Sequence, residues 1–209
     1  MFIDRFITFE GGEGSGKSTQ ARLLAEKLRS TGREVVLTRE PGGSPVAEKV
    51  RELILEEKPR SAVAELLLFA AARAEHIETT IGPALTRGAI VICDRFIDST
   101  RVYQGDLGHL DKALIETIEK ATVAPFFPAL TFILDVPAEA SMARAANRGE
   151  LNHYDRKDLS WHIALRLAFQ NAALAEPTRC ILIDGAGDRQ TIAAAIWRAV
   201  AARLTIEPR

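Results

Sequence analysis

The feature that most constrains this chain is a glycine-rich stretch near its start. Residues 9–19 read FEGGEGSGKST and match Gly-x-x-x-x-Gly-Lys-[Ser/Thr], with Gly11, Gly16, Lys17 and Ser18 at the fixed positions. Glycines let the backbone curl so that several N–H groups face one anion, and a following helix adds its positive N-terminal end. The pattern therefore predicts a phosphate-binding loop, in which Lys17 reaches the β- and γ-phosphates and Ser18 contacts Mg2+.

The residues on either side of this stretch support the prediction. Residues 5–10 (RFITFE) alternate like a strand, and residues 20–29 (QARLLAEKLR) place Ala21, Leu24 and Leu28 on one helical face. A glycine-rich surface turn is the alternative, but it would not require a strand before it and a helix after it.

Size and composition indicate one ordinary globular domain. The chain has 209 residues, of which 47% are hydrophobic, so we expect a single domain (1–209) with room for a lid. A net charge of −1 argues against partners such as nucleic acid or an anionic membrane, and the most apolar run, residues 62–72, is too short to span a bilayer. Because no signal peptide is visible, and Cys93 and Cys180 lie in apolar runs, we expect a cytoplasmic protein with buried thiols.

Short apolar runs alternate with helical stretches, which predicts a parallel sheet covered by helices. The expected strands are residues 5–10, 34–39, 89–94, 130–135 and 179–184. The expected helices are residues 20–29, 45–56, 61–87 with a bend near Gly82 and Pro83, 111–122, 138–148, 159–175 and 189–204. The last helix is expected to bury Ile192, Ile196, Trp197 and Val200. The predicted class is α/β, a three-layer P-loop NTPase-type fold with a five-stranded parallel sheet.

Charged residues follow several strands at the carboxyl edge, where open α/β sheets bind ligands. Asp94 ends a hydrophobic strand in the Walker B arrangement, which holds Mg2+ or its waters, whereas we expect Asp135 only to stop its strand and cap a helix. Arg39 leaves its strand before a Pro-Gly-Gly turn, where its planar guanidinium is suited to a phosphate. A solvated turn arginine is the alternative for Arg39.

Phe69 and Arg73 are four residues apart and share one face of an expected helix. In that arrangement a base can stack on the phenyl ring while the guanidinium donates to a ring carbonyl. On spacing alone, however, a core phenylalanine beside a surface arginine is the favoured interpretation.

Five stretches together make the chain similar to the thymidylate kinases. They are GGEGSGKST at 11–19, TREPGG at 38–43, LLFAAAR at 67–73, DRFIDSTRVYQG at 94–105 and RGEL at 148–151, in the order and spacing of that family. The resemblance implies a nucleoside monophosphate kinase-like fold with a helical lid over about residues 142–156. It also implies phosphorylation of dTMP to dTDP by ATP and Mg2+ in dTTP biosynthesis, and a cytoplasmic homodimer.

The resemblance further assigns individual roles. It implies that ATP is bound by Gly11, Gly12, Glu13, Gly14, Ser15, Gly16, Lys17, Ser18, Thr19 and Arg144, and Mg2+ by Ser18 and Asp94, directly or through water. It implies that dTMP is bound by Glu13, Arg39, Phe69, Arg73, Arg95, Thr100, Tyr103 and Gln104. In these roles Glu13 meets the 3′-hydroxyl, and Tyr103 crowds the 2′ position and so favours deoxyribose. The catalytic residues are Lys17, Arg95 and Arg148.

The lid departs from the family at one position. His153 stands where close relatives have arginine, so Arg156 is a candidate to replace that charge. Two other functions stay open from the residues alone: a kinase for another nucleotide, such as dUMP, or a nucleotide-binding switch without transferase activity. The pairing of Arg39 with Arg95, and of Phe69 with Arg73, argues against a switch, which has no use for an acceptor site.

Overall fold

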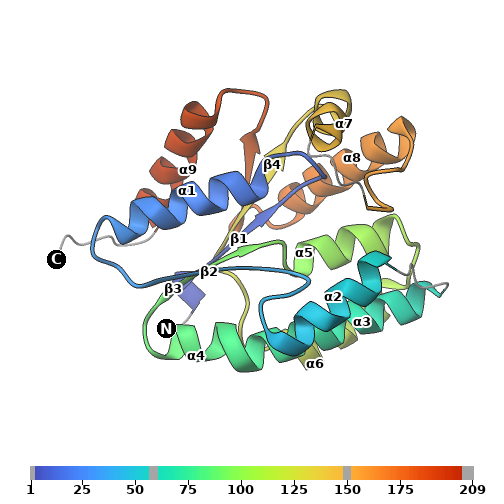
Figure 1. Ribbon diagram of the computed structural model, residues 1–209, viewed down its shortest axis with the longest axis horizontal. Helices are drawn as coiled ribbons and strands as arrows, with labels where there is room; N and C mark the ends of the chain where they lie inside the picture. Colours follow the sequence, from blue (N-terminus) through green and yellow to red (C-terminus); the bar gives the residue numbers. More distant parts are fainter. Residues whose placement is uncertain (1–2, 57–60, 148–151, 204–209) are drawn as a thin grey trace.

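The computed structural model describes residues 3–56, 61–147 and 152–203, and Figure 1 shows a central sheet between two layers of helices. The described sheet has five parallel strands in the order β2–β3–β1–β4–β5. The predicted fold class is therefore confirmed. The strands are β1 (Phe6–Glu10), β2 (Val35–Arg39), β3 (Ile90–Asp94), β4 (Leu130–Asp135) and β5 (Cys180–Asp184).

Helices connect the strands and cover both faces of the sheet. They are α1 (Lys17–Arg29), α2 (Pro45–Glu56), α3 (Ala62–His76), α4 (Gly82–Thr86), α5 (Ile97–Thr100), α6 (Lys112–Val123), α7 (Ala138–Ala146), α8 (Leu159–Ala175) and α9 (Arg189–Arg203). A 3-10 turn, η1 (Ile3–Arg5), precedes β1, and two segments are π-helical, η2 (Ile77–Ile81) and η3 (Arg101–Asp106). None of the helices in the described part of the chain has both the length and the hydrophobicity needed to cross a bilayer.

The helix predicted over residues 61–87 is three segments rather than one. The π-helical turn η2 separates α3 from α4 and ends just before Gly82. Pro83 lies in the first turn of α4. Proline is tolerated there because the first N–H groups of a helix have no intrahelical partner.

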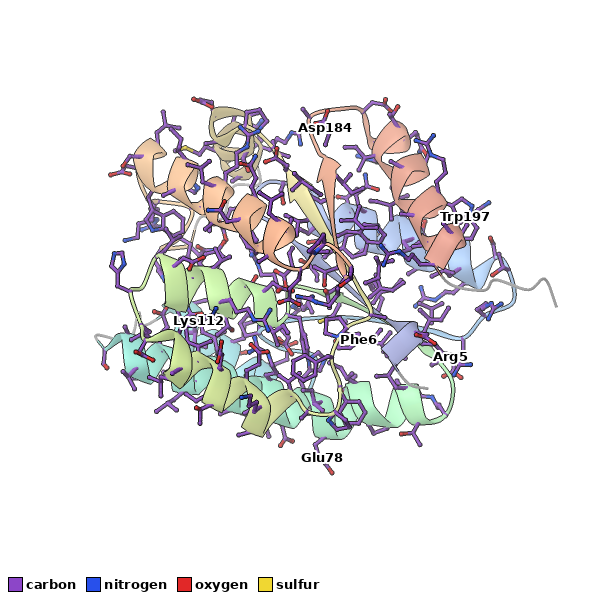
Figure 2. All side chains as sticks on the ribbon, turned by 180° about the vertical axis from the view of Figure 1, so that it is seen from behind. Arg5, Phe6, Glu78, Lys112, Asp184 and Trp197 are labelled. Carbon is purple, nitrogen blue, oxygen red and sulfur yellow. The ribbon has the colours of Figure 1, made fainter. Side chains whose placement is uncertain are left out.

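The sheet divides the core into two parts. Ile7 and Phe9 pack toward α1 and α9, whereas Phe6 packs toward η2 and α4 on the opposite face. On α9 the predicted Ile192, Ile196 and Val200 are buried, but Trp197 is only partly buried. The indole, labelled in Figure 2, packs against the edge of this core, and Lys27 of α1 places its ammonium 5.4 Å from the ring centre.

The strand register brings the functional segments to one edge of the sheet. Asp94 pairs in register with Phe9 on one side and with Arg39 on the other. The carboxyl ends of β1, β2 and β3 therefore lie next to one another, and the glycine-rich loop begins at this edge. Cys93 and Cys180 are free and buried, as the apolar context predicted.

Candidate active site

The glycine-rich loop, residues 11–18, joins β1 to α1 as predicted, and α1 begins at Lys17. Gly14 has a φ of 72°, and a Cβ at this position would lie 2.1 Å from the carbonyl oxygen of Ser141 on α7. The Ser141 hydroxyl also donates to the carbonyl of Glu13. The loop is thus held against α7, and glycine is required at position 14 both by the backbone angle and by this close approach.

Lys17 is buried at the base of this loop. Its ammonium donates to the carbonyl oxygen of Gly12 at 2.6 Å and to the hydroxyl of Ser15 at 3.3 Å. Burial, together with repulsion from Arg95, lowers the pKa of Lys17 to about 8, although nearby carboxylates oppose the shift. A buried cation with a lowered pKa gains from an anionic ligand, which restores its preference for the charged form.

The outer side of the loop borders an open hollow, which we call the P-loop hollow. Its volume is about 990 Å³, and it is lined by Gly14, Ser15, Gly16, Lys17, Ser18, Thr19, Gln20, Arg144, Gly187, Arg189 and Ile192. Arg144 donates to the carbonyl oxygen of Gly185 at 3.0 Å, across the mouth between α7 and the loop before α9. Two cations, Arg144 and Arg189, therefore face the same hollow as Lys17.

The predicted Mg2+ ligands lie beside this hollow, and of the two only Ser18 lines it. The Ser18 hydroxyl donates directly to the carboxylate of Asp94, so two oxygen ligands lie side by side beneath the loop. Such oxygens suit Mg2+, which binds through one or two protein groups plus phosphate and water. Within the described ranges no cluster of three His, Cys, Asp or Glu side chains could hold a metal.

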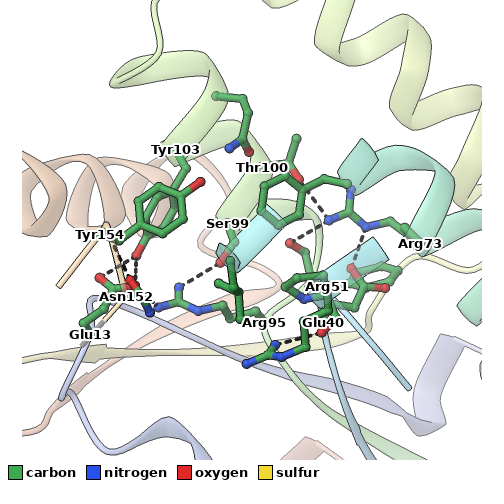
Figure 3. Close-up of a pocket in the computed structure, with 15 residues that line it drawn as sticks. Glu13, Glu40, Arg51, Arg73, Arg95, Ser99, Thr100, Tyr103, Asn152 and Tyr154 are labelled. Carbon is green, nitrogen blue, oxygen red and sulfur yellow. Dashed lines mark hydrogen bonds and ion pairs between the residues drawn. The ribbon is translucent and has the colours of Figure 1, made fainter. Parts of the chain in front are cut away.

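A second cavity, the aromatic pocket, lies on the other side of Arg95 and is shown in Figure 3. Its volume, counted together with the open solvent at its mouth, is about 580 Å³. It is lined by Glu13, Glu40, Pro41, Arg51, Leu55, Phe69, Arg73, Arg95, Phe96, Ser99, Thr100, Tyr103, Gln104, Asn152 and Tyr154. Seven of the eight residues predicted for dTMP are in this set, although they come from separate elements; Arg39 is the exception.

At one end of the aromatic pocket, Arg73 is held by a buried carboxylate. Its Nε donates to Glu40 at 2.7 Å, and its Nη2 donates to the Thr100 hydroxyl at 2.9 Å (Figure 3). Glu40 is also 3.1 Å from Nδ1 of His76. Because Arg73 is only 4% exposed and Phe69 lines the pocket, the interpretation as a core phenylalanine beside a surface arginine is wrong.

Removing the charge of Glu40 is expected to destabilise the protein through Arg73. Glu40→Gln should lower the free energy of unfolding by about 3 kcal/mol, because a buried guanidinium then has no counter-ion. Urea unfolding measures this loss. In the double variant Glu40→Gln/Arg73→Gln no charge is left unpaired, and we expect much of the loss to be recovered. If the losses in unfolding free energy of Glu40→Gln and Arg73→Gln simply added in the double variant, the pairing of Glu40 with Arg73 would be contradicted.

At the other end of the pocket, Arg95 joins it to the P-loop. Its guanidinium donates to the Gly11 carbonyl at 3.0 Å and to the Glu13 carboxylate at 2.7 Å. The Tyr103 hydroxyl donates to the same carboxylate at 2.7 Å. Burial raises the pKa of Glu13, but Arg95, Lys17 and Tyr103 outweigh it, so the pKa lies below its ordinary value and Glu13 is an anion at neutral pH.

Arg39 does not enter the aromatic pocket. It is half exposed and pairs with Glu48 at 2.9 Å, and it borders a separate open hollow together with Ser18 and Asp94. Arg51 of α2 lines the pocket instead and donates to the Pro41 carbonyl at 2.8 Å. Burial and the nearby Arg39 lower the pKa of Arg51, so the two guanidinium groups are close enough to repel.

The segment after α7 completes the pocket. Asn152 and Tyr154 line it, and the Tyr154 ring centre is 5.2 Å from that of Tyr103 in an edge-to-face arrangement. The Tyr154 hydroxyl also donates to Glu65 of α3, the helix that carries Phe69 and Arg73. Arg148, the predicted lid arginine, lies outside the described residues, as does the RGEL motif.

Sequence reasoning missed Arg51, Glu40, Asn152 and Tyr154. A signal for Arg51 was present: it shares the inward face of α2 with Ala47 and Ile54, which are fully buried. A cation on the apolar face of a helix indicates a buried partner or a ligand. Asp135 was expected to cap a helix, but it accepts two hydrogen bonds from Arg166 of α8 instead, at 2.6 and 2.8 Å.

The lowered pKa of Lys17 predicts a pH dependence for ATP. Below about pH 8 the free protein carries a charged Lys17, and above it the ammonium loses its proton, so kcat/KM for ATP should fall as pH rises through 8. Initial rates between pH 6.5 and 9.5 measure this. Lys17→Arg should move the fall beyond this range, because an arginine stays charged. A flat profile in the unsubstituted protein would show that Lys17 does not titrate there.

Fold and site together define a P-loop nucleoside monophosphate kinase, in which the phosphate loop borders the P-loop hollow on one side and the aromatic pocket on the other. The family model for thymidylate kinase matches residues 9–196. The chain belongs to the thymidylate kinase family.

Individual relatives agree over nearly the whole chain. The thymidylate kinase of Nitrobacter hamburgensis is 48% identical over 97% of this chain and 90% of its own length. That of Caulobacter vibrioides is 48% identical over 95% of this chain and 97% of its own. The crystal structure of thymidylate kinase from Ehrlichia chaffeensis has a TM-score of 0.76 at 36% identity, covering 94% of this chain and 97% of that one. The chain is thus a phosphotransferase that converts dTMP to dTDP, as its motifs predicted.

Proposed function

We propose that the chain transfers the γ-phosphoryl group of ATP from the P-loop hollow to dTMP in the aromatic pocket, with Mg2+ as cofactor. The observation that supports this most directly is the position of Arg95. Its guanidinium contacts a P-loop carbonyl and lines the aromatic pocket at once. A phosphate of dTMP beside Arg95 would therefore lie next to the end of a triphosphate bound on residues 11–18.

In this proposal the aromatic pocket binds dTMP along its length. Thymine stacks on Phe69, and Arg73 donates to its O4 carbonyl, with Thr100 and Gln104 bordering the base. Tyr103 lies against the sugar and leaves no room for a 2′-hydroxyl, while Glu13 accepts from the 3′-hydroxyl. Arg95 and Arg51 bind the phosphate, and Arg39 is near enough to join them when a phosphate offsets the repulsion between the guanidinium groups.

In the P-loop hollow, backbone N–H groups of residues 11–19 and the ammonium of Lys17 bind the ATP phosphates. Arg144 lies where it can cover the adenine. Ser18 and Asp94 would hold Mg2+, which when bound neutralises charge on the phosphates.

The proposed catalysis is positioning and charge neutralisation. The attacking group is an ionised phosphate, so no strong general base is required. Lys17 and Arg95 supply fixed positive charge at the transferring group. We further propose that the segment 142–156 closes as a lid, bringing Arg148 to the same group and excluding water that would otherwise hydrolyse ATP.

The proposed setting is a cytoplasmic homodimer formed by a single kinase domain. Exposed apolar side chains on α3 and α6, namely Val63, Leu67 and Leu114, make this face the candidate contact surface. The substrates are the small molecules dTMP and ATP, with no nucleic acid or membrane partner.

One assay tests the proposal against its competitors. ADP release is measured with ATP and Mg2+ alone, and then with dTMP, dUMP or dCMP added. We expect release to depend on an acceptor and to be fastest with dTMP. Equal rates with dTMP and dCMP would remove the role of Phe69 and Arg73 in recognising thymine, and ADP release independent of any acceptor would favour a nucleotide-binding switch.

A further inference from the structure

Arg95 adopts a backbone conformation that an arginine rarely takes. Its φ is 69°, in the left-handed region, where a residue other than glycine is strained unless its surroundings hold it. The last two residues of β1 provide that hold. The N–H of Arg95 donates to the Phe9 carbonyl at 2.8 Å, and the N–H of Phe96 donates to the Glu10 carboxylate at 2.7 Å. The amides on both sides of the strained residue are therefore fixed by β1.

Glu10 also acts on the side chain of Arg95. Its second carboxylate oxygen accepts from the Ser99 hydroxyl at 2.6 Å, and that hydroxyl oxygen accepts from Nη1 of Arg95 at 3.1 Å. A serine hydroxyl has one proton and two lone pairs. Because the proton is given to Glu10, the lone pairs of Ser99 are left for the guanidinium.

Glu10 makes these contacts although it does not itself line the aromatic pocket. It is fully buried, and its two hydrogen-bond donors, Phe96 and Ser99, are themselves residues that line the pocket. Burying a carboxylate costs free energy unless the group is paired or hydrogen-bonded. Here that cost is offset by the hydrogen bonds that Glu10 accepts from the Phe96 N–H and the Ser99 hydroxyl.

We propose that Glu10 is a positioning residue that sets both the backbone and the guanidinium of Arg95 for the acceptor phosphate. The inference rests on the role proposed above for Arg95. Because Glu10 directly precedes Gly11, it ties the geometry of the acceptor site to the first residue of the P-loop.

The protonation state of Glu10 gives the inference a distinct signature. Burial, with repulsion from Asp98, raises its pKa to about 7, while Ser99, Arg95 and the Phe96 N–H act in the opposite direction. Charged or titratable groups that sense it are Lys17 on α1, Cys93 and Arg95 at the end of β3, Asp98 on α5 and Cys180 on β5. A protonated Glu10 can donate to Ser99 and so compete with Arg95, which should raise KM for dTMP as pH falls through 7.

Two variants test the positioning role. Glu10→Gln keeps an acceptor for the Phe96 N–H but turns an NH2 group toward Ser99. Ser99→Ala removes only the hydroxyl that links Glu10 to the Arg95 guanidinium. We expect KM for dTMP to rise about tenfold in Glu10→Gln and about threefold in Ser99→Ala, with KM for ATP changed less than twofold. KM for dTMP between pH 6 and 8 should change less in Glu10→Gln than in the unsubstituted protein.

Thr8→Val is the matched control, because Thr8 is also fully buried on β1 but its hydroxyl bonds to Thr131 of β4 at 2.7 Å rather than to the segment 95–99. It should leave KM for dTMP unchanged. If Glu10→Gln changes only the free energy of unfolding, and keeps the KM and pH profile of the unsubstituted protein, Glu10 is purely structural and the inference is overturned. If Glu10→Gln does not fold, an unchanged KM for dTMP in Ser99→Ala would show that the link from Glu10 through Ser99 does not set the Arg95 guanidinium, and the inference would be overturned.

The outcome for Arg95→Lys separates this inference from the proposed function. A normal KM for dTMP in Arg95→Lys would contradict the phosphate-binding role of Arg95 itself. A raised KM in Arg95→Lys with a normal KM in Glu10→Gln would leave that role standing and remove only the contribution of Glu10.

Discussion

Lys17→Ala is expected to lower kcat by about 10²–10³-fold, the loss typical when one preorganised electrostatic group is removed from an active site. Lys17 is buried at the base of the glycine-rich loop, so solvent cannot replace its charge. The fold should survive, because alanine favours the first turn of α1 and the change removes a cation that burial disfavours. Steady-state ADP release and thermal unfolding measure the two effects.

Arg22→Ala provides the control for Lys17→Ala. Arg22 is an exposed cation on the same helix, so its loss should change turnover less than twofold. If Lys17→Ala retained near-normal turnover while still folded, the role given to Lys17 in phosphoryl transfer would be wrong.

Arg95→Lys is expected to lower kcat/KM for dTMP by about 30–300-fold, corresponding to roughly 2–3 kcal/mol. The guanidinium donates to Gly11, Glu13 and Ser99 at once, and an ammonium cannot reproduce this fork. Lysine keeps the positive charge beside the buried Glu13, so the loss should appear in catalysis more than in stability. Initial rates at varied dTMP and saturating ATP measure it.

Arg87→Lys is the control for Arg95→Lys, because Arg87 forms an exposed ion pair with Glu34, far along the chain from the P-loop. Exposed pairs contribute little, so this variant should behave like the unsubstituted protein. A folded Arg95→Lys variant with unchanged kcat/KM for dTMP would contradict the placement of the acceptor phosphate.

The regular elements were predictable from the sequence where strong boundary signals met strong periodicity. β4, α2 and α8 begin and end at the predicted residues, 130–135, 45–56 and 159–175. Each is an apolar or amphipathic run with a clear limit, such as Pro45 at the start of α2 or the Asp158 side chain, which accepts from the Trp161 N–H at the start of α8.

The π-helical segment η3 was not predictable in the same way. It carries Tyr103 and Gln104 into the aromatic pocket. A π-helical turn differs from an α-helix by its hydrogen-bond spacing, and no residue type marks it in a sequence. The motif therefore identified these residues as site residues without indicating how the backbone presents them.

The motifs indicated which residues gather at the site, but not how their charges are balanced. Glu40 holds Arg73, and Glu13 holds Arg95, through contacts between residues 33 and 82 positions apart. Arg39 faces Glu48 because that partner lies on α2, which the turn after β2 brings close. Long-range pairings of this kind depend on the tertiary fold, and spacing within a motif does not contain them. The role of Arg148 stays a prediction, since it lies outside the described residues.

The central claim is that dTMP and ATP meet end to end across Arg95. The most direct measurement is a crystal structure of the chain with dTMP, Mg2+ and a non-hydrolysable ATP analogue. We predict thymine against Phe69 and Arg73, the dTMP phosphate beside Arg95, and the triphosphate on residues 11–18. Density for dTMP anywhere other than between Phe69 and Arg95 would contradict the account.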